Sequence, residues 1–157
     1  MRKVMANTTP LIALANIDRL ELLHKLYGTI IVPQTVMDEI IREPARQRVQ
    51  NSSWIRVEAI QDISQRDYYR ARLHAGEVDV MILAREQKAD LVIMDDDAAK
   101  KTAKFLGLKV TGTLGVLLKA KREGYLEKVE PVINELIRDG LFISDTVKEY
   151  VMTEAGE

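Results

Sequence analysis

Short apolar runs alternate along this chain with longer segments in which apolar residues recur at helical spacing. Four runs of aliphatic and β-branched residues predict buried strands, at residues 3–6, 29–33, 91–94 and 108–111. Residues 11–26 predict two short helices, and residues 34–47 predict one helix whose buried stripe includes Ile41. Residues 54–60 alternate apolar and polar positions, which is typical of an edge strand or an extended connector.

Helical spacing continues to the end of the chain. It predicts helices over residues 64–73, from 76 to a tight connection at 89–90, and over 98–106, 112–124, 128–138 and 144–152. Residues 141–143 are a candidate for one more short strand. Strands that alternate with helices predict an α/β fold around a parallel sheet. Because no linker or repeat interrupts the pattern, residues 1–157 are expected to form one domain, with residues 125–157 as a helical extension.

The amino-acid composition mainly excludes certain classes of function. The 157 residues carry a net charge of -1, so a broadly basic surface for nucleic acid is not expected and any such contact must be local. The absence of cysteine excludes disulfides, thiolate metal sites and cysteine nucleophiles. No apolar run approaches the roughly 18 residues that span a bilayer, and the N-terminus turns polar too early for a secretory signal. We therefore expect a cytoplasmic protein without membrane contact.

Acidic and amide side chains follow two of the predicted strands. Asn7 comes after the first strand, and Asp95, Asp96 and Asp97 come directly after the strand at 91–94. In a parallel sheet these ends share one edge, where α/β proteins bind their ligands. Mg²⁺ or Mn²⁺ takes oxygen ligands and keeps several waters, so one or two carboxylates suffice. Such an ion lowers the pKa of a water and polarises a phosphodiester, which suggests phosphate-ester hydrolysis.

A purely structural explanation exists for each of these residues. The three aspartates are good caps for the helix that follows them, and Thr9 and Thr113 are good caps whatever the function. Under this structural explanation, Glu39 is a solvated helix residue, and Glu77 only stabilises the start of its helix through the helix dipole. The order in which the acids occur along the chain favours a site over this alternative.

Several short segments together resemble a known family. They are residues 7–12 (NTTPLI), 32–39 (VPQTVMDE), 76–79 (GEVD) with 82–84 (ILA), 95–97 (DDD) and 112–113 (GT). In this order they resemble a PIN domain, and more narrowly the prokaryotic branch related to VapC-type toxin nucleases. The resemblance extends from residue 5 to about residue 124. It implies a three-layer α/β/α sandwich with a mainly parallel central sheet, and a Mg²⁺- or Mn²⁺-dependent ribonuclease acting on single-stranded RNA.

The resemblance also implies roles for individual residues. The first acid of the family falls on Asn7, and the expected metal ligands and catalytic residues are Asp79, Asp96, Asp95 and Glu39. The accessory residues are Asn7, Thr9, Glu77, Asp97 and Thr113. Glu77 and Asp79 are two positions apart on a helix and cannot share a face, so Asp79 is predicted to be the ligand and Glu77 an accessory residue.

Asn7 leaves more than one function open, because its amide offers an oxygen without the negative charge of aspartate. The leading function is a ribonuclease, as in the toxin of a toxin–antitoxin pair. The alternative is a catalytically weak or inactive PIN-like module that binds RNA or a protein. A phospho-accepting receiver ranks last, since it needs a pair of acids where this chain has Asn7 and Thr8. The resemblance implies a homodimer and a small antitoxin as partners beside RNA.

Overall fold

Five short parallel strands form the centre of the molecule, in a computed structural model that describes residues 2–71 and 73–157. The strands are β1 (Val4–Ala6), β2 (Ile30–Val32), β3 (Ile55–Val57), β4 (Leu91–Ile93) and β5 (Val110–Thr111). They pair in the order β3-β2-β1-β4-β5, and every pair is parallel. The predicted parallel α/β fold is therefore confirmed, and residues 54–60 contribute the edge strand β3.

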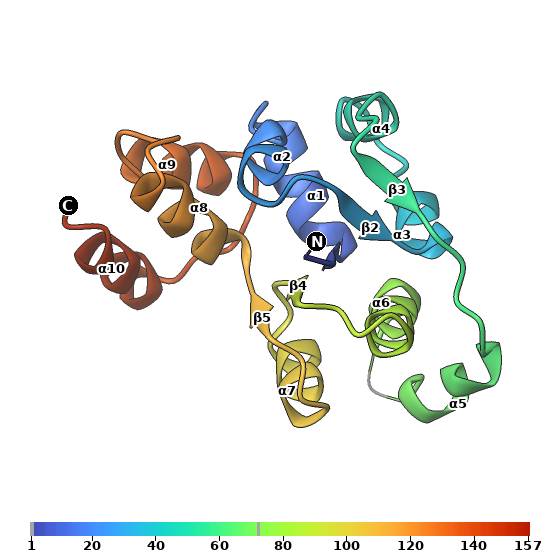
Figure 1. The fold of residues 1–157 in the computed structure, drawn as a ribbon. Coiled ribbons are helices and arrows are strands. Elements are labelled where there is room, and N and C mark those ends of the chain that lie inside the picture. The colour runs from blue at the N-terminus through green and yellow to red at the C-terminus, as the bar shows by residue number, and fades with distance from the viewer. Residues whose placement is uncertain (1, 72) are drawn as a thin grey trace.

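Helices surround this sheet. They are α1 (Thr8–Asn16), α2 (Glu21–Tyr27), α3 (Gln34–Glu39), α4 (Ala45–Gln50), α5 (Arg66–Tyr69), α6 (Ala75–Glu86), α7 (Asp97–Phe105), α8 (Thr113–Arg122), α9 (Glu130–Arg138) and α10 (Asp145–Glu154). Figure 1 shows α1, α2 and α4 on one side of the sheet and α6 and α7 on the other. The arrangement is the predicted α/β/α sandwich.

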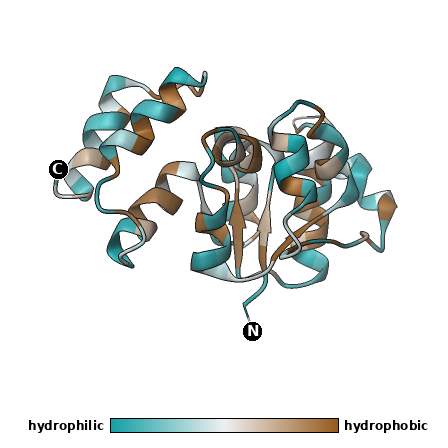
Figure 2. Ribbon diagram, turned by 90° about the horizontal axis from the view of Figure 1, so that it is seen from above, coloured by the Kyte–Doolittle hydropathy of each residue, from teal (hydrophilic) through white to brown (hydrophobic). Residues whose placement is uncertain are grey.

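The core lies between these layers. β1 and β2 are buried along their whole length, as expected for strands covered on both faces, and the strands are brown between the helices in Figure 2. α6 is the most deeply placed helix, because every residue from 76 to 84 is buried. The residues at the start of α6 are consequently held by packing from several sides.

Two predicted helices are shorter in the structure. The helix predicted over residues 34–47 is divided into α3 and α4, and Ile41 between them is 72% exposed rather than buried. Pro44 accounts for the break, because proline has no amide hydrogen and disfavours a helical conformation of the residue before it. The helix predicted over residues 64–73 reduces to a short 3₁₀ turn (Ile63–Gln65) followed by α5, and residue 72 lies outside the described residues.

The C-terminal helices α9 and α10 lie beside the sheet rather than over it (Figure 2). Residues 141–143, predicted as a short strand, instead form an irregular link between these helices. The Glu157 carboxylate accepts hydrogen bonds from Val129 N at 2.8 Å and Lys121 Nζ at 2.9 Å, which joins the end of the chain to the start of α9. No helix within residues 2–71 and 73–157 is long and apolar enough to cross a membrane.

Candidate functional site

The order of the strands reverses at the centre of the sheet. β1 lies between β2 and β4, so the chain leaves β1 toward one side and later returns to its other side. Asn7 is the first residue after β1, and its backbone N–H donates to Ile93 O in β4 at 2.9 Å. Ligands of open α/β sheets bind in the crevice outside the carboxyl ends of the strands at such a reversal.

A pocket of about 430 Å³ lies beside this reversal, and we call it the acidic pocket. Three elements that are distant in sequence supply its walls: the start of α1, the end of α3 and the start of α6. The lining residues are Asn7, Thr8, Thr9, Asp38, Glu39, Ile41, His74 and Glu77. The structure thus brings together Asn7, Thr9, Glu39 and Glu77 from the residues that the sequence singled out.

Asn7 contributes an unusual oxygen to the acidic pocket. The residue is only 5% exposed, and no donor among the described residues hydrogen-bonds to its Oδ1. A buried polar atom without a partner costs about 1–3 kcal/mol, so native structures contain few of them. An unpaired amide oxygen in a wall shared with carboxylates is suited to bind a cation.

Glu39 is the last residue of α3, and its carboxylate lies against the start of α6. Thr8 Oγ1 donates to Glu39 Oε1 at 3.2 Å. A Cβ atom on Gly76 would lie 1.8 Å from the same oxygen, so only glycine allows this approach. Burial raises the pKa of the Glu39 carboxyl, the Thr8 hydrogen bond opposes that change, and the charge of Glu77 raises the pKa further.

Glu77 projects from the first turn of α6 into the same pocket. Its side chain is buried, and Oε1 accepts a hydrogen bond from His74 N at 3.0 Å. This contact caps the helix and fixes the orientation of the carboxylate. The acidic pocket therefore holds two oriented carboxylates, of Glu39 and Glu77, and the unpaired oxygen of Asn7.

Asp79, predicted as the main metal ligand, lies close enough to Glu39 for their charges to interact, but it does not line the acidic pocket. Its carboxylate accepts hydrogen bonds from Arg66 Nε at 2.9 Å and Arg66 Nη2 at 3.0 Å, and a third from Thr35 Oγ1. These contacts join α3 and α5 to α6, away from the lining of the acidic pocket. The structure therefore favours Glu77 rather than Asp79 as the acid that α6 contributes to a site.

The three aspartates after β4 have structural partners. Asp95 accepts from Thr113 N at 2.8 Å and Thr113 Oγ1 at 2.6 Å, which joins β4 to the start of α8. Asp96 caps α7 by accepting from Ala99 N at 2.9 Å, and Asp97 is the exposed first residue of that helix. Thr113 is buried as the first residue of α8 and donates to Asp95, whereas Gly112 occupies the cap position.

The ligand set of Asp79, Asp96, Asp95 and Glu39 stays a prediction. Within the described ranges, 2–71 and 73–157, no three His, Asp or Glu side chains lie close enough together to hold a metal ion. The donor set that the structure offers is the pair of carboxylates with the Asn7 amide. This set fits Mg²⁺ or Mn²⁺, which commonly bind through one or two carboxylates and retain water ligands.

Sequence reasoning overlooked the residues that orient the pocket. Thr8 orients Glu39, and the backbone of His74 orients Glu77. The spacing from His74 to Glu77 is that of a helix N-cap and the third helical residue, so a capping contact was a detectable signal. Arg66 had no comparable signal, because its contact with Asp79 depends on how α5 packs against α6.

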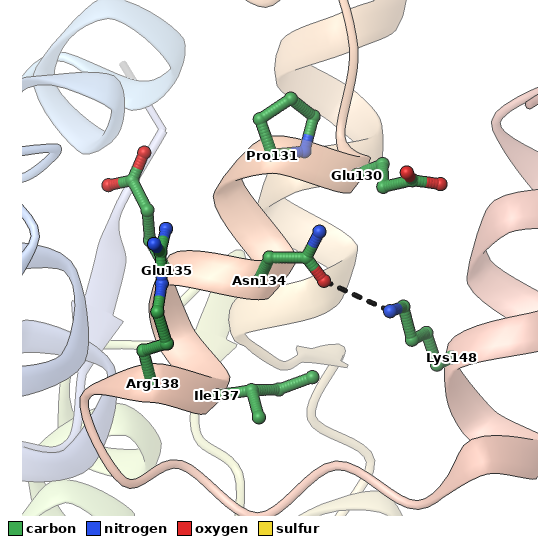
Figure 3. A pocket seen from close by; sticks show the side chains of 7 residues that line it. All are labelled: Glu130, Pro131, Asn134, Glu135, Ile137, Arg138 and Lys148. Atoms are coloured by element: carbon green, nitrogen blue, oxygen red, sulfur yellow. Dashed lines mark hydrogen bonds between the residues drawn. The ribbon is translucent and has the colours of Figure 1, made fainter.

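A second pocket, of about 620 Å³, lies between α9 and α10 and is shown in Figure 3. Its lining comes from these two helices alone and carries both charges, including Glu130, Glu135 and Arg138. Lys148 Nζ donates to Asn134 Oδ1 at 2.9 Å across it. The pocket shares no residue with the sheet edge, so we do not assign it to the candidate site.

An α/β/α sandwich with an acidic pocket at the reversal of a parallel sheet defines a class of proteins that bind ligands at the carboxyl edge. The family can be stated more closely, because the profile of a PIN-domain family matches residues 3–157. The chain belongs to the PIN-domain family, whose fold is a nuclease fold, so the resemblance to a PIN domain is confirmed. Among curated proteins, none matches the chain.

Proposed function

We propose that the protein is a Mg²⁺- or Mn²⁺-dependent ribonuclease with its metal ion in the acidic pocket. One observation carries the proposal: the buried Oδ1 of Asn7 has no donor among the described residues and shares a pocket with the carboxylates of Glu39 and Glu77. Membership of the PIN-domain family supports nuclease chemistry for such a pocket.

Some residues of the acidic pocket supply charged or neutral oxygen atoms, and others orient the carboxylates. Glu39 and Glu77 supply two negative charges, and Asn7 supplies a neutral oxygen. Thr8 holds the Glu39 carboxylate, and the His74 backbone holds that of Glu77, so neither has to be ordered when a ligand binds. When bound, a divalent cation provides a more acidic water and polarises the phosphodiester.

Asp79, Asp95 and Asp96 act in this proposal as positioning residues rather than ligands. Asp79 fixes α6 against α5, and Asp95 fixes the end of β4 against α8. The first contact holds the helix that carries Glu77, and the second holds the end of β4, which accepts a hydrogen bond from Asn7 N through Ile93 O. Their removal is expected to lower stability first and cleavage only as a consequence.

The experiment is cleavage of a mixed-sequence single-stranded RNA with Mn²⁺, with Mg²⁺ and with chelator. We expect cleavage by the wild type only with a cation, and a loss of at least about tenfold in Glu39→Gln and in Glu77→Gln. Glu127→Gln is the matched control, because it is the same substitution at an exposed acid outside the acidic pocket. Cleavage in chelator, or an equal loss in the control, contradicts the proposal.

Asn7 supports a second candidate function, a weakly active or inactive module that binds RNA or a protein. Its amide oxygen attracts a dication less strongly than a carboxylate does. RNA binding by pure wild type without cleavage in either cation would favour this candidate. The toxin role, the antitoxin, the homodimer and the cytoplasmic location stay predictions from the resemblance to toxin nucleases.

A further inference from the structure

A groove of about 600 Å³ lies between α5 and the second half of α7, and we call it the aromatic groove. Tyr68 and Tyr69 line it from α5, and Phe105 lines it from the last position of α7. Leu73 also lines the groove, whereas the next residue, His74, lines the acidic pocket. The two hollows therefore adjoin the same segment of chain at successive residues.

The aromatic side chains of this groove are unusually accessible. Phe105 is 89% exposed and Tyr68 is 79% exposed. Exposed apolar surface within a hollow is typical of an interaction site, whereas single apolar residues on a convex surface are common. These two rings are available to a ligand without any rearrangement of the core.

A basic side chain lies on the same side of α7. Lys101 lines the aromatic groove four residues before Phe105, so the two share one face of the helix. Among the described residues, none of the lysines of α7 (Lys100, Lys101 and Lys104) forms an ion pair with an acid. The groove thus combines flat apolar rings with the positively charged side chain of Lys101.

We propose that the aromatic groove binds single-stranded RNA and leads it to the acidic pocket. Bases stack on Tyr68 and Phe105, and Lys101 contacts a phosphate, which is how proteins hold single strands without reading their sequence. The lysines favour RNA over a protein, since an apolar partner surface would bury the rings but leave these charges unpaired. This inference rests on the proposed ribonuclease function, because it describes how the substrate of that function is held.

The test is the affinity for a fluorescein-labelled, mixed-sequence single-stranded RNA, measured by fluorescence anisotropy in chelator so that no cleavage occurs. Phe105→Ala is expected to weaken binding about tenfold, the loss typical of one stacked base. Phe142→Ala is the matched control, since Phe142 is also 89% exposed but lies between α9 and α10. Lys101→Gln is expected to reduce the slope of log affinity against log salt by about 0.7.

Each outcome separates this inference from the ribonuclease proposal. Equal affinities of Phe105→Ala and Phe142→Ala would overturn the groove as an RNA site, while cation-dependent cleavage by the same samples would leave the ribonuclease standing. Light scattering tests whether the groove instead binds a second copy of the chain. If the wild type is a dimer, and Phe105→Ala is a monomer with unchanged RNA affinity, the groove is a dimer contact and the inference is overturned. A wild type that neither binds nor cleaves RNA contradicts both proposals.

Discussion

Gly76→Ala tests the acidic pocket with the smallest change that the chain allows. The added Cβ would lie 1.8 Å from Glu39 Oε1, whereas real Cβ contacts essentially never fall below 3.0 Å. The Glu39 carboxylate must therefore withdraw from the start of α6 by more than about 1 Å. A displacement of this size at a reacting centre costs about 100-fold in rate, so we expect cleavage to fall by that factor.

The same substitution is expected to leave the fold intact. Alanine in place of glycine stabilises a helix by about 0.5–1 kcal/mol, and the lost hydrogen bond from Thr8 to Glu39 costs about as much. The free energy of unfolding should thus change by less than about 1 kcal/mol. Gly115→Ala in α8 is the matched control, since its Cβ would meet Thr111 Oγ1 at 2.2 Å, outside the acidic pocket.

The assay pairs the single-turnover rate of RNA cleavage in Mn²⁺ with thermal unfolding of both variants. We expect Gly76→Ala to lose cleavage with a near wild-type Tm, and Gly115→Ala to retain both. A wild-type cleavage rate in Gly76→Ala would refute the reasoning, because the position of the Glu39 carboxylate would then not matter. Equal losses in the two variants would refute it as well.

Three further predictions test the neighbouring residues. Asn7→Asp should bind Mn²⁺ at least about tenfold more tightly in calorimetry and cleave RNA faster, and unchanged affinity would remove Asn7 from the site. Asp79→Asn should lower the stability by about 1–3 kcal/mol in thermal unfolding, since the partly buried guanidinium of Arg66 loses its partner, while the folded protein keeps its Mn²⁺ affinity. Burial would raise the pKa of Glu157, but hydrogen bonds from Lys121 and from two backbone amides at the start of α9 lower it below its ordinary value. This stabilisation is complete above the ordinary pKa and is lost as the pH falls through the lowered one, so Glu157→Gln should lower the Tm more at about pH 7 than in acid. A Tm difference that persists undiminished in acid would contradict this assignment.

The strands were predictable because each buried parallel strand is a short, nearly continuous apolar run. The helix boundaries were less predictable from the sequence, and residues 34–47 illustrate the reason. Their apolar spacing continues past Glu39, but Pro44 prevents a continuous helix and turns Ile41 outward. That break leaves Glu39 at the end of α3. The break therefore determines where one wall of the acidic pocket lies.

The candidate site was predictable only in part, for a reason that Glu77 and Asp79 illustrate. Their spacing established that they point to different faces of one helix, but not which face meets the sheet edge. Tertiary packing decides this, since Arg66 and Thr35 approach the face that carries Asp79. Asn7 was located correctly at the edge because its position depends only on the end of β1.

The reversal of strand order also determines when during synthesis the acidic pocket can form. Asn7 and Glu39 leave the ribosome early, but β1 obtains its central neighbour only when β4 has been made. Until then the start of α6, with Glu77, has no completed sheet edge to pack against. Because such distant pairing forms slowly, the acidic pocket is among the last parts of this fold to be completed.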